Sequence, residues 1–138
     1  MSTSAEGSTS RPWLLAALAA GVAYVVIGRV FAWPATHVQA WRYLAWVASG
    51  VVFWLHFAIE RTRWRHAPRA IAVHTALGVA IGAFLLAVAG MVHNASAGEQ
   101  LGARWLIALV AWPAITAIPA FLVALVAATV LARRTAAR

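Results

Sequence analysis

The sequence predicts an all-α integral membrane protein, a bundle of four transmembrane helices with both its N- and C-termini in the cytoplasm. Hydrophobic residues make up 64% of the 138 residues and charged residues only 10%, whereas a soluble chain carries roughly 25% charged residues to cover its surface. The chain also contains four apolar stretches with the roughly 20 residues that a helix needs to cross the hydrocarbon core of a bilayer.

The boundaries of these stretches divide the chain into a tail, a membrane domain and a second tail. Residues 1–12 are mostly small and polar, so we expect a disordered tail. Pro68 disfavours helix at the residue before it and suits the first helical turn after it, so it marks the connection between the second and third helices. A basic tail, residues 133–138, ends the chain. Within the domain 13–132 the expected helices cover residues 13–33, 40–60, 69–92 and 104–132.

The arginines predict the orientation. Basic residues near helix ends are retained on the cytoplasmic side, and eight of the eleven arginines fall on the side of the two termini and the middle connection. The chain has no lysine and a formal net charge of +8. Nucleic acid is not the expected partner, because these arginines lie at the ends of apolar segments, where anionic lipid headgroups attract them. We therefore expect a multi-pass protein of a bacterial-type inner (plasma) membrane.

Small residues predict how the helices pack. Helices in a bilayer approach one another closely where small side chains meet, and Gly78 and Gly82 on the third helix and Ala17 and Gly21 on the first have the required spacing. A bundle of this size can also form a homo-oligomer or join a larger membrane complex, and both remain open.

Two histidines and a glutamate form the candidate site. His74 shares a helix face with Gly78, and His56 lies on the small-residue face of the second helix, one turn before Glu60. The two imidazoles are expected at similar depth, because each lies five residues from the arginines that flank the middle connection. Ionisable residues inside spanning helices are costly and indicate function by default.

Three interpretations of this candidate site remain open. His56 and His74 would hold a haem b as axial ligands, or both would bind a divalent metal together with Glu60, or the same residues would relay protons. The simplest alternative is an interfacial polar cluster in which His56, Glu60, His74 and neighbouring arginines join the second helix to the third. Since the chain has no cysteine, disulfides, thiolate metal sites, iron–sulfur clusters and c-type haem are excluded.

The basic middle connection is expected to bind anionic lipid headgroups, each arginine adding about 1 kcal/mol near an anionic leaflet. The residues concerned are Arg61, Arg63, Arg65 and Arg69.

No nucleophile–base constellation is visible. The leading functional hypothesis is therefore a non-catalytic accessory or structural component of the membrane. A haem- or metal-binding redox subunit that uses His56 and His74, and a small oligomeric transporter or channel, are the alternatives.

Overall fold

The computed structural model describes residues 12–98 and 102–137, and these residues form four α-helices. The helices are α1 (Pro12–Val30), α2 (Val38–Thr62), α3 (Pro68–Ser96) and α4 (Ala103–Ala136). All four are long and apolar enough to cross a membrane, so the four helical segments predicted from the sequence are present. The expected disordered tail, residues 1–12, lies outside the described residues except for Pro12, which begins α1.

The helix ends differ from the predicted ones by a few residues. Helix α1 stops at Val30 rather than Trp33, because Pro34 disfavours helical backbone at the residue before it; the chain turns there, with the Trp33 N–H donating to the Val30 carbonyl at 3.3 Å. Helix α4 continues beyond the predicted end to Ala136, so most of the expected basic tail, residues 133–138, is helical.

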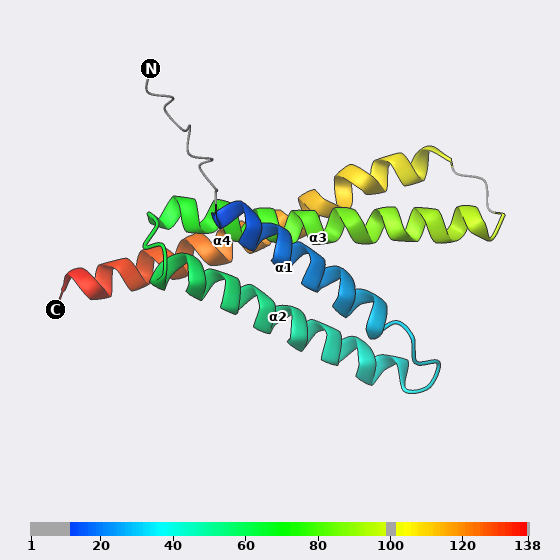
Figure 1. Cartoon of the computed structure of the whole chain (residues 1–138), viewed down its shortest axis with the longest axis horizontal. Coiled ribbons are helices and arrows are strands. Elements are labelled where there is room, and N and C mark those ends of the chain that lie inside the picture. The colour runs from blue at the N-terminus through cyan, green and yellow to red at the C-terminus, as the bar shows by residue number, and fades with distance from the viewer. Residues whose placement is uncertain (1–11, 99–101, 138) are drawn as a thin grey trace, which may run out of the picture.

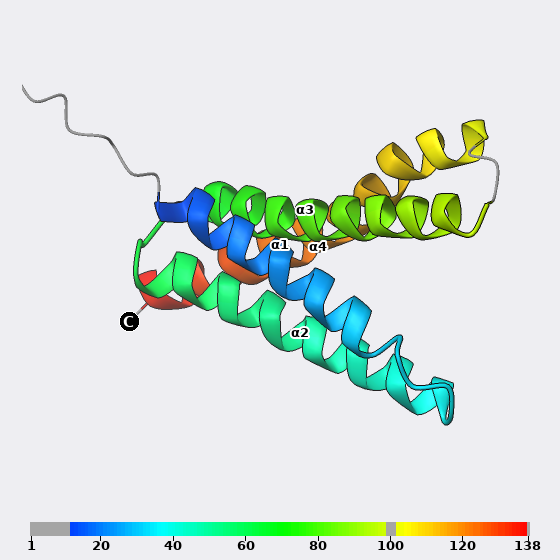
Figure 2. The same ribbon diagram turned by 45° about the vertical axis from the view of Figure 1, so that its right-hand side comes forward.

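Helix α3 is the central helix and packs against each of the other three. We call one end of the molecule the basic end: there α1 begins, α2 ends, α3 begins and α4 ends (Figure 1). Towards the opposite end the pair α1 and α2 diverges from the pair α3 and α4, as both views show (Figure 2). The helices are therefore held together most closely in the half that includes the basic end.

The contact between α1 and α3 depends on glycines. A Cβ atom placed on Gly82 would lie 2.6 Å from the Cβ of Tyr24, and one placed on Gly21 would lie 2.5 Å from a methyl group of Ile81. Real Cβ atoms do not approach so closely, so both positions require glycine for this helix spacing. The small-residue faces predicted for these two helices are thus the faces that meet.

The compact core lies near the basic end, where Phe57, Ile71 and Ala72 pack against Ala124 and Ala128 of α4. Elsewhere the helices expose apolar side chains: Trp46 is 77% exposed, and only 11% of the most apolar window of α4 is buried. Exposure on this scale is unfavourable in water and is ordinary against lipid tails. The surface therefore fits a multi-pass membrane protein.

Candidate metal centre

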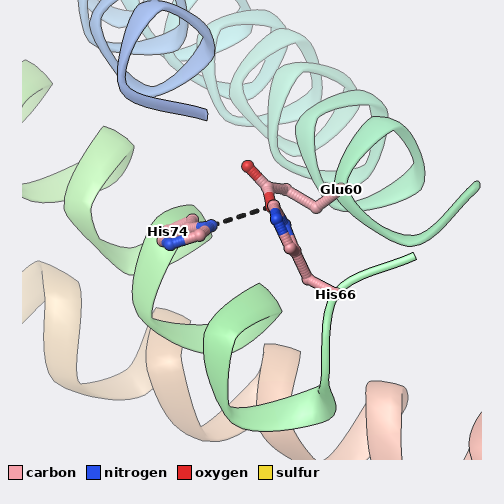
Figure 3. A group of neighbouring side chains, drawn as sticks. All are labelled: Glu60, His66 and His74. Carbon is pink, nitrogen blue, oxygen red and sulfur yellow. Dashed lines mark hydrogen bonds and ion pairs between the residues drawn. The ribbon is translucent and has the colours of Figure 1, made fainter. Parts of the chain in front are cut away.

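A buried carboxylate lies at the basic end. Glu60 is the only acidic residue within residues 12–98 and 102–137, and its side chain is fully buried in the last turn of α2. Its Oε2 lies 2.6 Å from Nδ1 of His66 and 2.8 Å from Nδ1 of His74 (Figure 3). Taking an ionised carboxylate out of water is costly unless it is paired and hydrogen-bonded. Two imidazoles from different parts of the chain provide that pairing here.

The turn after α2 brings His66 back to Glu60. Arg65 adopts a left-handed conformation with φ 51°, which is uncommon for a residue other than glycine. The reversal lets the His66 N–H donate to the Glu60 carbonyl oxygen at 3.4 Å. Pro68 then occupies the first turn of α3, a position that its fixed φ favours. Glu60 and His66 are thus joined by both main chain and side chain.

Helix α1 fixes the third member of the group. The indole of Trp13 stacks on the imidazole of His74, with ring centroids 4.3 Å apart and planes 8° from parallel. The His66 ring meets the His74 ring edge to face, at a centroid distance of 5.0 Å. Stacking and packing of this kind restrict the rotation of His74. Its Nδ1 is therefore held towards Glu60, as Figure 3 shows.

These three side chains have the donor types and spacing of a metal site. One oxygen of Glu60 and one nitrogen each of His66 and His74 all lie within 4.8 Å of one another, and no ion is present. Metal–ligand bonds of about 2.0–2.2 Å meeting at tetrahedral or octahedral angles separate the donors by roughly 3.0–3.4 Å. The two oxygen–nitrogen distances are shorter than this, so an ion would replace the hydrogen bonds of Glu60 to His66 and His74. Two imidazoles and a carboxylate suit zinc and other divalent transition metals.

His56 lies one helical turn away from this group rather than in it. Its Nε2 is 3.6 Å from Oε1 of Glu60, beyond hydrogen-bond distance. Its ring lies against Gly78, where an added Cβ would come within 3.1 Å of Nδ1. Glu60 meets His74 whereas His56 meets Gly78, so the expectation that His56 and His74 lie at similar depth is wrong by about one turn. Both ring nitrogens of His56 are buried without a hydrogen-bond partner among the described residues.

The arrangement suits a single ion better than a haem. One face of the His74 ring is covered by Trp13, and its Nδ1 is directed at Glu60. The His56 ring is packed between α2 and α3, only 4% exposed. Two axial ligands would have to face each other across a macrocycle, whereas these two rings are packed against Trp13 and Gly78.

The four arginines predicted to bind lipid headgroups separate into two pairs. Arg61 and Arg65 line an open cavity beside His66, while Arg63 and Arg69 are exposed elsewhere around the turn. Arg61 Nη2 donates to the Leu131 carbonyl and lies within reach of the Thr135 hydroxyl, both at 3.3 Å.

Sequence reasoning placed Glu60 and His74 in one polar cluster, and the structure brings them together. Neither His66 nor Trp13 was predicted from the sequence to belong to this cluster. A histidine six residues after a carboxylate and two before a proline is the one available signal for His66, and it becomes informative only once the turn is known.

No protein-family profile matches the chain, and neither the curated proteins nor the solved structures contain a match.

Proposed function

We propose that the protein is a multi-pass component of a bacterial-type inner membrane that binds one divalent transition-metal ion through Glu60, His66 and His74. The observation that supports this proposal is the convergence of two imidazole nitrogens on an oxygen of a fully buried carboxylate. An ion held there would join the end of α2, the following turn and the start of α3. The role is that of a non-catalytic accessory or structural component whose basic end is closed by metal.

Charge favours an ion at this position. A buried carboxylate is costly without a positively charged partner, and a divalent cation compensates that charge while supplying direct bonds. His56 then acts as a positioning residue: a small movement of its Nε2, now 3.6 Å from Oε1, would hydrogen-bond the oxygen that the metal leaves free. Such outer partners of metal ligands typically change affinity by about 10–100-fold.

The positive-inside rule places the basic end in the cytoplasm. Six arginines of the described residues lie there: Arg61, Arg63, Arg65, Arg69, Arg133 and Arg134. The opposite ends of the helices carry Arg29, Arg42 and Arg104. The metal would accordingly exchange with the cytoplasm, on the side where His66 is 31% exposed.

Metal binding is tested with protein purified without a polyhistidine tag, so that all imidazoles belong to the chain. Zinc content is measured by mass spectrometry of the elements, and Co²⁺ titration followed by absorbance gives stoichiometry and affinity. We expect one equivalent. His66→Ala and His74→Ala should each weaken affinity by at least about 100-fold, since each removes a ligand.

The chain offers two matched controls, because His37 and His93 lie at the opposite end and outside the candidate group. Alanine at either position should leave affinity unchanged. His56→Ala distinguishes a positioning residue from a ligand. A decrease in metal affinity of about tenfold fits a positioning role, and a decrease equal to that of His74→Ala would make His56 a ligand. Full metal content in the His66→Ala, His74→Ala double variant, or none in the wild type after zinc loading, would exclude the proposed site.

A further inference from the structure

A second polar site adjoins the metal centre and shares one residue with it, His66. An open cavity of about 510 Å³ lies at the basic end, between the turn that follows α2 and the last turns of α4. Its wall contains two arginines, two threonines and a histidine on one part and apolar side chains on another. The lining residues are Arg61, Thr62, Arg65, His66, Pro68, Ile71, Ala128, Ala132 and Thr135.

The two arginines of the cavity are held in place by the fold. Arg61 is fixed by its contacts with the Leu131 carbonyl and the Thr135 hydroxyl, both on α4. Arg65 occupies the left-handed position of the turn, and the next residue is tied back to Glu60 through its N–H. The guanidinium group of Arg61 is therefore held by α4, and the turn fixes the backbone from which the Arg65 side chain reaches the cavity.

The cavity contains positive charge and no counter-ion from the described residues. Glu60, the only acid there, is fully buried and its Oε2 is directed at two imidazoles. Among residues 12–98 and 102–137, neither Arg61 nor Arg65 has a carboxylate within ion-pair distance. Guanidinium groups bind phosphate oxygens through planar, paired donors. The hydroxyls of Thr62 and Thr135 donate to the Ala58 and Leu131 carbonyls, so the donors for phosphate come from the arginines.

The remaining wall is apolar. Pro68 and Ile71 of α3 face Ala128 and Ala132 of α4 around the same cavity, close to where the apolar helices end. A phosphate with a glycerol or acyl group attached would find both guanidinium groups and hydrocarbon in this lining.

From this cavity we infer a phosphate-binding site in which Arg61 and Arg65 bind the phosphate group of an anionic ligand. The group comes either from an anionic phospholipid of the surrounding leaflet or from phosphate in the cytoplasm. Arg63 and Arg69 do not line the cavity and contribute only general positive charge.

Calorimetric titration of the purified full-length protein, metal-free and in phosphate-free buffer, tests the inference. The ligands are dioctanoyl phosphatidylglycerol, dioctanoylglycerol (which lacks the phosphate) and inorganic phosphate. The test variant is Arg61→Gln with Arg65→Gln, and the matched control is Arg63→Gln with Arg69→Gln, which removes the same charge from the same end of the molecule. Because Arg61→Gln also removes a contact with α4, Arg65→Gln alone is measured too, with circular dichroism to check folding.

We expect phosphatidylglycerol to bind the wild type at one site, more tightly than dioctanoylglycerol. The test variant should bind it at least about tenfold more weakly, the lower range for losing one charge-assisted hydrogen bond, and the control no more than about threefold more weakly. The affinity of the Arg65→Gln variant for phosphatidylglycerol should lie between those of the test and control variants. Inorganic phosphate that binds as tightly as the lipid identifies soluble phosphate as the source, and much weaker binding identifies the lipid.

Three results would overturn the inference. If both double variants bound phosphatidylglycerol equally weakly, general surface charge would explain the effect. If dioctanoylglycerol bound as tightly as phosphatidylglycerol, the protein would not recognise the phosphate. If neither phosphatidylglycerol nor inorganic phosphate bound the folded wild type, the cavity would not be a phosphate-binding site. None of these results bears on metal binding, because the titrations use metal-free protein.

Discussion

Replacing Glu60 by glutamine tests the candidate metal centre with almost no change in shape. The amide is isosteric with the carboxylate, so the packing of this fully buried side chain is conserved. Only the charge and one acceptor oxygen are lost. The consequences for the metal-free and metal-loaded protein differ, and that difference makes the variant informative.

In the metal-free protein the expected cost is small. Oε2 accepts from His66 at 2.6 Å and from His74 at 2.8 Å. A hydrogen bond to a charged group contributes about 1.5–3 kcal/mol and a neutral one about 0.5–1.5 kcal/mol, so each bond loses roughly 1 kcal/mol when the acceptor becomes an amide. His66 is 31% exposed, and water compensates for part of its loss. We expect the free energy of unfolding to fall by about 1–2 kcal/mol.

Zinc should stabilise the wild type and the Glu60→Gln variant by different amounts. An ion that binds only the folded state at 100 times its dissociation constant stabilises that state by about 2.7 kcal/mol. The wild type should gain this increment, and Glu60→Gln should gain almost none, because a neutral amide is a poor ligand for zinc. Unfolding is measured by circular dichroism during titration with dodecyl sulfate, with and without zinc, and His93→Ala is the control. An equal zinc increment in Glu60→Gln would refute the assignment of Glu60 as a ligand.

Three further predictions concern packing, orientation and the stacked indole. Gly82→Ala places a Cβ 2.6 Å from that of Tyr24 and should cost about 1–3 kcal/mol of unfolding free energy; Gly50→Ala, with nothing within 4 Å, should be neutral or slightly stabilising. A C-terminal fluorescent-protein fusion should fluoresce and a C-terminal alkaline phosphatase fusion should be inactive, and the reverse pattern would contradict cytoplasmic termini. Trp13→Ala should weaken cobalt affinity about tenfold by freeing the stacked imidazole, whereas Trp46→Ala, at an exposed position, should not.

The four helices could be predicted from the sequence because length and apolarity are properties of continuous segments. Their ends were less predictable: α1 stops short before Pro34, and α4 extends over the final arginines, where apolarity no longer indicates helix. The pairing of Glu60 with His74 also followed from the sequence, since antiparallel neighbours joined by a short connection bring such residues together.

His66 could not be predicted in the site, because its position depends on one backbone angle. Arg65 adopts φ 51° although it is not glycine, and no local sequence signal announces that conformation. The resulting turn ties His66 to Glu60. His66, and not His56, is therefore the second imidazole in the group with His74.

The structure gives one reason to favour metal binding over a purely structural polar cluster. Arg61 directly follows Glu60 in the sequence, and an arginine is the ordinary partner that neutralises a buried carboxylate. Arg61 instead contacts α4, and within the described residues every ion-pair partner of Glu60 is a histidine. At this arginine-rich end of the bundle, an imidazole nitrogen can bind a cation, whereas a guanidinium group has no acceptor atom with which to do so. A carboxylate next to two imidazoles, with the Arg61 guanidinium directed at α4, is a ligand set that a divalent ion can use.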